Sequence, residues 1–193
     1  RLVVIGGSPS LGASAHEIRA LHADRWIVPG AFHWCHENGI EGAVLNIDPQ
    51  AFIADLVRGA KRAVLATYTH PSVFDALPDA DIQVFEVVSE PAEECNHGGT
   101  AASSAMVQGI KAGYTEILFY GCESSFAEDG PTHHYEDDPN KARIWVATSS
   151  GTFCTGPMLL IQAEFMAFAF RVAAVTCGGK HNPFIDRSGG LLE

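Results

Sequence analysis

Short apolar runs of strand length alternate with helical patterns along the first two thirds of this chain. Most of the runs are continuously apolar, which is typical of strands covered on both faces. The pattern predicts strands at Leu2–Ile5, Trp26–Val28, Ala43–Ile47, Ala63–Thr67, Ile82–Val88 and Ile117–Tyr120, and helices at Ser14–Ala23, Pro49–Arg58, Pro71–Leu77 and Thr100–Ala112. This alternation predicts a three-layer α/β fold with a mostly parallel, doubly wound sheet.

The last third departs from this rhythm. Residues 123–141 are polar and contain an acidic cluster, and a loop of this length is typical of a binding loop or a lid, with a disordered excursion as the alternative. Beyond them we expect a strand at Arg143–Thr148, a long apolar helix at Gly156–Arg171 and a last strand at Val172–Thr176. We therefore expect a single domain over residues 1–177 and a C-terminal tail over residues 178–193, which is available for packing on a partner subunit in a homo-oligomer.

The balance of charge narrows the class of partner. The formal net charge of −11 argues against a nucleic-acid partner and against an anionic membrane surface, because both require clustered lysine and arginine. The most apolar stretch, Pro157–Val175, carries Gln162, Glu164 and Arg171, and these interruptions argue against a membrane span. Five dispersed cysteines without a CxxC pair favour a cytoplasmic protein. Cys122 is the one cysteine that lies at a strand end beside polar residues.

A glycine-rich loop follows the first strand. It reads Gly6-Gly7-Ser8-Pro9-Ser10, where glycines allow backbone N–H groups to turn toward an anion and the next helix adds its positive dipole end. The loop lacks the full dinucleotide-binding pattern and the Walker A pattern. We interpret Gly6, Gly7, Ser8 and Ser10 as a phosphate cradle, and a simple tight connection is the alternative.

Other polar residues follow other predicted strands. Asp48 comes after the third strand, where ligands of open α/β sheets bind, so it is placed to meet a ribose, a substrate or a metal. The alternative role is a helix N-cap with Pro49 as the first helical residue. Glu123 follows the sixth strand, and together with Asp48 it is a candidate Mg²⁺ ligand, because this ion favours carboxylates and substrate phosphates.

Two further segments contain candidate binding and catalytic residues. Gly98, Gly99 and Thr100 open a helix lined with small residues, which favours close approach of a ligand or, alternatively, tight helix packing. His133 in the polar loop is a candidate acid or base, the alternative being a solvated side chain. The cluster His33-Trp34-Cys35-His36 either contacts a base or sugar or serves in packing.

Taken together, these motifs and their order resemble the MptE-like family of Rossmann domains, which is named for a 6-hydroxymethylpterin diphosphokinase. The resemblance covers roughly residues 2–170 and rests on the segments VVIGGSPSL, LNIDPQ, HGGTAASSAMVQGIKAGYTEILFYGCESSF, THHY and SSGTFCTGPMLLIQAEFMAF. It implies a Rossmann-like, nucleotide-binding transferase. One activity of the family is Mg²⁺-dependent diphosphate transfer from ATP to the hydroxymethyl group of a reduced pterin. Glu123 stands where the family usually has aspartate, and GGSPSL replaces the commoner GxGPSL.

The resemblance also implies roles for individual residues. Gly6, Gly7, Ser8 and Ser10 would cradle phosphate, Asp48 and the turn Gly98–Thr100 would line the nucleotide pocket, and His133 would belong to an active-site loop. The first loop is also similar to the start of bacterial sialyltransferases, which use CMP-activated sugars.

Three hypotheses follow. The first is an enzyme that transfers diphosphate from ATP, with Mg²⁺, to a hydroxymethylpterin-like acceptor. The second is a glycosyltransferase that uses a nucleotide-activated sugar, with a histidine such as His133 as base. The third is a non-catalytic nucleotide-binding or assembly module in which the acidic loop and the apolar final helix form a partner interface.

Overall fold

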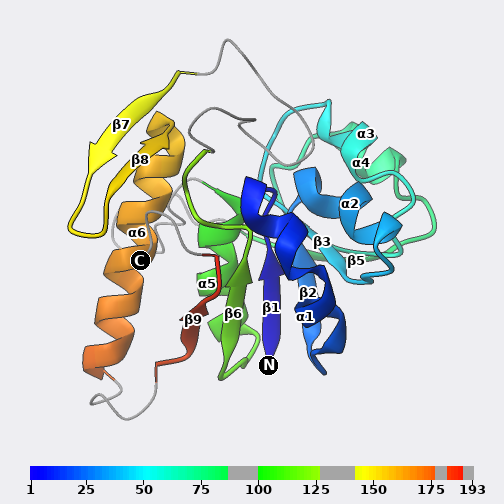
Figure 1. Ribbon diagram of the computed structural model, residues 1–193. Coiled ribbons are helices and arrows are strands. Elements are labelled where there is room, and N and C mark those ends of the chain that lie inside the picture. The colour runs from blue at the N-terminus through cyan, green and yellow to red at the C-terminus, as the bar shows by residue number, and fades with distance from the viewer. Residues whose placement is uncertain (87–99, 127–141, 177–181, 189–193) are drawn as a thin grey trace.

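Seven parallel strands form the main sheet of this computed structural model, which describes residues 1–86, 100–126, 142–176 and 182–188 (Figure 1). The strand order is β5-β4-β3-β2-β1-β6-β9. The strands are β1 (Leu2–Ile5), β2 (Asp24–Ile27), β3 (Ala43–Asn46), β4 (Arg62–Ala66), β5 (Asp81–Phe85), β6 (Ile117–Tyr120) and β9 (Phe184–Asp186). The central strand β1 pairs in parallel on both sides, with Val4 beside Trp26 of β2 and Phe119 of β6.

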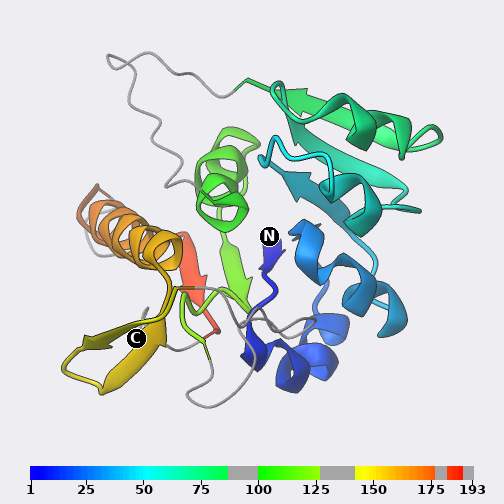
Figure 2. The ribbon, with the colours of Figure 1, turned by 90° about the horizontal axis from the view of Figure 1, so that it is seen from above.

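Helices cover both faces of the sheet and complete three layers (Figure 2). One face carries the 3₁₀ helices η1 (Pro9–Ser14) and η2 (Pro29–Ala31) and the helices α1 (Ala15–Ala20), α2 (Phe32–Glu37), α3 (Ile53–Leu56) and α4 (Pro71–Asp75), and the other carries α5 (Ala101–Lys111) and α6 (Pro157–Thr176). Side chains of β1 divide between the two cores, because successive residues of a strand point to opposite faces. Val3 and Ile5 enter the first core, and Leu2 and Val4 enter the second. The predicted Rossmann-like fold is confirmed.

The chain reverses direction across the sheet between β1 and β6. Strands β1 to β5 follow one another outward on one side of β1, and α5 then leads to β6 on its other side. Such a reversal creates a crevice at the carboxyl ends of the two strands, which is where ligands of open α/β sheets bind. The glycine-rich loop after β1 and the segment Gly121–Glu123 after β6 meet there.

The C-terminal third differs from expectation in two places. The expected strand at Val172–Thr176 is wrong, since α6 runs to Thr176 and Ala173 packs against the second core. Part of the expected tail is a strand: Phe184–Asp186 forms β9 beside β6, so the sheet extends past the expected boundary at residue 177. Phe184 holds this short strand in place, because its ring lies 5.5 Å from that of Phe170 and 6.4 Å from that of Phe119.

A separate antiparallel hairpin precedes α6. It consists of β7 (Ile144–Ala147) and β8 (Thr152–Thr155), and β8 leads directly into the helix. The hairpin confirms the strand expected at Arg143–Thr148 and adds a partner strand that the sequence pattern did not indicate.

The helix expected at Pro49–Arg58 is reduced to α3, because Asp48 and Gln50 form a side-chain turn ahead of it.

The approach of β1 to β6 depends on a glycine at position 6. A Cβ atom there would lie 2.1 Å from the carbonyl oxygen of Gly121. We expect Gly6→Ala to lower the free energy of unfolding by about 1–3 kcal/mol or more, because the backbones must separate. Chemical denaturation would measure this. The matched control is Gly12→Ala, where nothing lies within 4 Å of the added atom, and an equal loss in both variants would contradict the prediction.

Candidate functional site

Two adjoining pockets open at the carboxyl ends of the strands. The larger has a volume of about 640 Å³ and lies beyond β2, β3 and β4, and the smaller, of about 180 Å³, lies between the ends of β1 and β6, α5 and α6. Both are lined by Gly30, Thr100 and Ala101, so the two pockets are direct neighbours. The larger volume falls in the range of pockets that hold small molecules.

The glycine-rich loop lines the smaller pocket but uses most of its backbone amides internally. Gly6 N–H donates to the carbonyl of Tyr120 at 2.8 Å, and Ser8 N–H donates to that of Gly121 at 3.0 Å. Ser10 N–H donates to Glu123 at 3.0 Å. Among the described residues, the Gly7 N–H and the Ser8 hydroxyl have no hydrogen-bond partner. The loop therefore offers a ligand these two groups, fewer than the sequence predicts.

The start of α5 supplies two more donors to the smaller pocket. Thr100 caps this helix, with its hydroxyl accepting from Ser103 N–H at 3.2 Å, while the Ser103 hydroxyl accepts from Thr100 N–H at 3.2 Å. The N–H groups of Ala101 and Ala102 donate to no other described residue, as expected for the first turn of a helix. Both residues line the smaller pocket. They add two N–H groups and the positive end of the helix dipole.

A buried polar network forms the base of the smaller pocket. Gln162 of α6 accepts from the Thr100 hydroxyl at 2.6 Å and donates to the Ser124 hydroxyl at 2.7 Å. Thr155 of β8 donates to the carbonyl of Ser124 at 2.6 Å. Ser124 has a φ of 56°, in the left-handed region that non-glycine residues rarely adopt. These bonds hold α5, α6, β8 and the segment after β6 together around the pocket.

Asn46 and Asp48 shape the larger pocket. Asn46 is buried, and its amide donates to the carbonyl of Asp48 at 2.9 Å and to the Thr69 hydroxyl at 3.2 Å. Its side-chain oxygen accepts from Asp48 N–H at 3.0 Å, and Asp48 in turn accepts from Gln50 N–H at 2.9 Å. Asp48 is thus a turn residue rather than the N-cap of α3, whose cap is Phe52. Its carboxylate stays partly exposed at the pocket wall.

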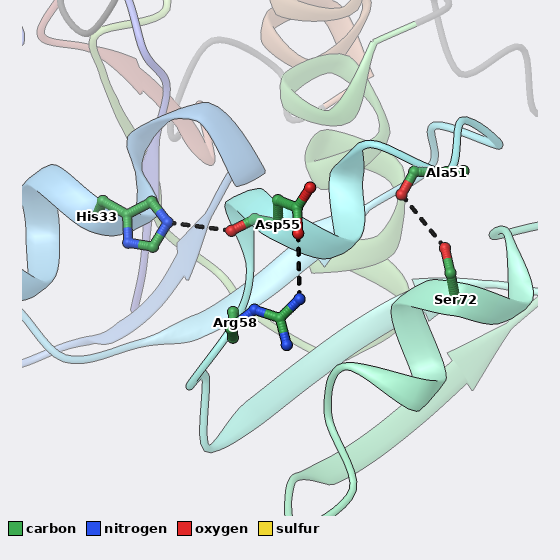
Figure 3. A network of polar contacts seen from close by, with 5 residues as sticks. All are labelled: His33, Ala51, Asp55, Arg58 and Ser72. Atoms are coloured by element: carbon green, nitrogen blue, oxygen red, sulfur yellow. Dashed lines mark hydrogen bonds and ion pairs between the residues drawn. The ribbon is translucent and has the colours of Figure 1, made fainter.

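Residues 50–56 form one side of the larger pocket, and polar contacts hold this segment to α4 and α2 (Figure 3). The Ser72 hydroxyl of α4 donates to the carbonyl of Ala51 at 3.2 Å. The His33 ring of α2 lies 3.2 Å from the carbonyl oxygen of Asp55, and Arg58 forms an exposed ion pair with the Asp55 carboxylate at 3.1 Å. His33 therefore serves in helix packing, and it does not line the pocket.

Glu123 is engaged by the glycine-rich loop. Its two carboxylate oxygens accept from Ser10 N–H at 3.0 Å and from the Ser10 hydroxyl at 2.7 Å. Burial raises the pKa of this carboxyl above its ordinary value, although the bonds from Ser10 act in the opposite direction. Ser10 and Glu123 thus fasten the loop after β1 to the segment after β6, and neither lines the two pockets.

The structure does not bring Asp48 and Glu123 together as a metal pair. They follow β3 and β6, which are separated by β2 and β1, so the strand ends lie about 14 Å apart at about 4.8 Å per strand spacing. Mg²⁺ binds its ligands at about 2.1 Å, which two carboxylates so placed cannot satisfy. The described part of the chain contains no group of three or more His, Cys, Asp or Glu side chains suited to a metal ion.

Cys122 lines the smaller pocket as a neutral thiol. It is buried, and its Sγ lies 3.5 Å from the Tyr120 carbonyl. Burial raises the pKa of this thiol well above its ordinary value, and the negative charges of Glu123 and Asp186 add to the effect. Since the thiolate is the reactive form, Cys122 is not a nucleophile near neutral pH.

Several residues singled out in the sequence lie outside the described residues, namely His97, Gly98, Gly99, His133, His134 and Tyr135.

Other residues of the site were not expected. Phe52 and Tyr68 line the larger pocket and are about half exposed, a signal that only the structure reveals. Gln162 had a signal in the sequence, because it is one of three polar residues, with Glu164 and Arg171, within an apolar helical stretch.

Lysine and arginine are absent from the described residues that line the two pockets. Arg19 donates to the carbonyl of Asn38 at 2.9 Å, and Arg143 lies over the ring of Phe126, 5.8 Å from its centre. Among the described residues, those that line the site offer an anion N–H and O–H donors.

The buried network predicts that replacing two buried glutamines by leucine has different effects on the free energy of unfolding. We expect Gln162→Leu to lower the free energy of unfolding by about 1–3 kcal/mol, because it removes the acceptor of the Thr100 hydroxyl and the donor to the Ser124 hydroxyl inside the protein. The control is Gln108→Leu on α5, since the side-chain nitrogen of Gln108 is buried and has no partner in the described structure. We expect that change to be neutral or stabilising. Urea denaturation of both variants would test the difference, and equal losses would contradict it.

The raised pKa of Glu123 predicts a pH-dependent effect. In the folded chain the charged carboxylate is disfavoured, so Glu123 supports stability below its ordinary pKa of 4.5 and loses that contribution as the pH rises through the raised pKa. We expect Glu123→Gln to raise the melting temperature at pH 7, by about 2–4 °C for each kcal/mol recovered, and to give no gain at pH 4. Thermal unfolding would measure this, with exposed Glu41→Gln as control. A lower melting temperature at pH 7 would show that the charged bonds to Ser10 outweigh burial.

Comparison with known proteins adds no relative to this picture. No protein-family model, curated protein or solved structure matches the chain significantly. The fold is therefore established by the sheet and its helices, and the resemblance to the MptE-like family stays an expectation from the residues.

Proposed function

We propose that the two adjoining pockets bind a nucleoside phosphate and that the protein is a nucleotide-dependent transferase. The observation that carries the proposal is the position of the site at the reversal of strand order, where a small pocket rich in N–H donors adjoins a larger one. The small pocket suits a phosphate and the large pocket suits a nucleoside.

Four donors support the assignment of phosphate to the smaller pocket. They are the N–H groups of Gly7, Ala101 and Ala102 and the hydroxyl of Ser8. Two come from the loop after β1 and two from the first turn of α5, and all four residues line the smaller pocket. Such N–H groups bind anions without a positively charged side chain.

The lining of the larger pocket supports a nucleoside. Phe52 and Tyr68 offer aromatic surfaces to a base, and Asp48 offers a carboxylate to ribose hydroxyls. Because its backbone N–H is held by Asn46 and its carboxylate accepts from Gln50, Asp48 needs little reorganisation on binding.

The carboxylates distinguish two transferase reactions. Glu123 is bonded to Ser10, and Asp48 follows a distant strand, so the expected pair of Mg²⁺ ligands does not fit. This favours transfer from a nucleotide-activated sugar, which does not require that pair. Diphosphate transfer from ATP to a hydroxymethylpterin-like acceptor remains the second candidate, with Asp48 as the one carboxylate among the described residues that line the pockets.

Thermal stabilisation by ATP, CTP, GTP and CMP, each with and without Mg²⁺, tests the proposal. We expect at least one of them to stabilise the chain without Mg²⁺. At a concentration a hundredfold above its dissociation constant the gain is about 2.7 kcal/mol, or roughly 5–11 °C in melting temperature. Stabilisation by ATP that requires Mg²⁺ would favour diphosphate transfer instead. If none of the four shifts the melting temperature at millimolar concentration, nucleotide binding is excluded.

A variant pair at residue 101 tests the phosphate site directly. Proline is well tolerated as the first residue of a helix, and Thr100 already has the extended backbone (φ −132°, ψ 160°) that precedes proline. Ala101→Pro therefore removes one N–H donor while preserving α5. We expect it to weaken nucleotide binding about 10- to 100-fold, which corresponds to one hydrogen bond to a charged group. Ala101→Gly keeps the N–H and should bind as the wild type does. Equal affinities in calorimetry would contradict the assignment.

A further inference from the structure

Helix α6 carries an apolar stripe that is largely exposed among the described residues. The stripe is formed by residues at alternating intervals of three and four, namely Met158, Ile161, Phe165, Phe168, Val172 and Val175, of which Phe165 is half-buried and also packs against the second core. Met158 is 54% exposed, Phe168 58% and Val175 79%. This 3–4 spacing is the pattern by which one helix packs along another.

The opposite side of α6 is bound to the domain. Gln162, Ala163 and Met166 are buried, and Phe170 packs against Phe119 and Phe184. In Figure 1, α6 lies at one edge of the molecule, with α5 and β9 on its inner side. The helix is thus a fixed element of the fold that presents a second apolar face outward.

Two charged residues beside the stripe argue against burial of α6 in a membrane. The segment Pro157–Val175 is long and apolar enough to cross a bilayer by length and composition, with a mean hydropathy of 1.7. Glu164 and Arg171, however, lie exposed along the margin of the stripe in the middle of the helix, where a bilayer core disfavours charge strongly.

The same two charges are complementary in a symmetric, antiparallel pair of α6 helices. In that arrangement Met158 packs against Val175 of the second copy, Ile161 against its Val172, and Phe165 against its Phe168. All six stripe residues are then matched in one register. Glu164 meets Arg171 of the second copy, and the two-fold axis repeats this ion pair. In a parallel pair Glu164 would face Ala169 instead, and no charges would match.

We propose that α6 is the docking surface for a second copy of this chain, which packs antiparallel through the apolar stripe and two Glu164–Arg171 ion pairs. The interface is isologous, as is usual for soluble dimers. It is independent of the proposed nucleotide site. Leu159 and Gln162 of the same helix nevertheless line the smaller pocket, so the dimer would brace one wall of that pocket.

Sedimentation velocity of the full chain over a wide concentration range tests the proposal. We expect a species of twice the 20.6 kDa chain mass. Phe168→Asp places like charges near the two-fold axis and should raise the dimer dissociation constant about a hundredfold or more. The matched control is Val84→Asp on β5, at the opposite end of the sheet, because Val84 is 55% exposed and Phe168 58%. This variant should dimerise as the wild type does.

Charge reversal tests the antiparallel register. Glu164→Arg alone and Arg171→Glu alone each place like charges together and should raise the dissociation constant about tenfold. The double variant E164R/R171E restores opposite charges and should return it toward the wild-type value. Dimerisation that does not respond to these changes would overturn the register. A wild-type chain that stays monomeric, or that floats with phosphatidylcholine vesicles as a monomer, would overturn the proposal.

Discussion

The close contact between the backbones that follow β1 and β6 is the constraint on which the site depends. Gly6 N–H and Ser8 N–H bond to carbonyls of Tyr120 and Gly121, and only a glycine at position 6 leaves room for that contact. The hydrogen bonds from Ser10 to the Glu123 carboxylate join the same two segments a few residues further along. Two strands that neighbour each other in space, though more than a hundred residues apart in sequence, thereby present one continuous rim to a ligand.

The buried network around Gln162 joins the segment after β6 to the helix layer formed by α5 and α6. Through Thr100 and Ser124, one side chain of α6 fixes both the first turn of α5 and the segment after β6. A polar group costs stability when it is buried without partners, so such a network specifies one arrangement of its elements. The positive φ of Ser124 persists because four elements meet around it.

Sequence patterns predicted the sheet well and the site only in part. Continuous apolar runs such as Leu2–Ile5 and Ile117–Tyr120 identified strands to the residue, because strands buried on both faces tolerate few polar side chains. Strand β9 escaped because its three residues are held by Phe184 packing on distant rings. The phosphate cradle was overestimated, since a motif does not reveal that the amides of Gly6, Ser8 and Ser10 are already bonded. Gln162 was visible as an anomaly, but its partners are set by the fold.

The donors at the smaller pocket have a consequence for the ligand's chemistry. N–H dipoles fixed by a capped helix and a tight loop bind through geometry, and their attraction is short in range. Ionic strength screens mainly long-range fields between exposed charges. The affinity of this site for an anion would therefore depend only weakly on salt concentration. The net negative charge of the chain would lower the association rate of an anion more than it lowers the affinity. Such a site would select an anion by how well it fits the fixed donors rather than by attraction from a distance.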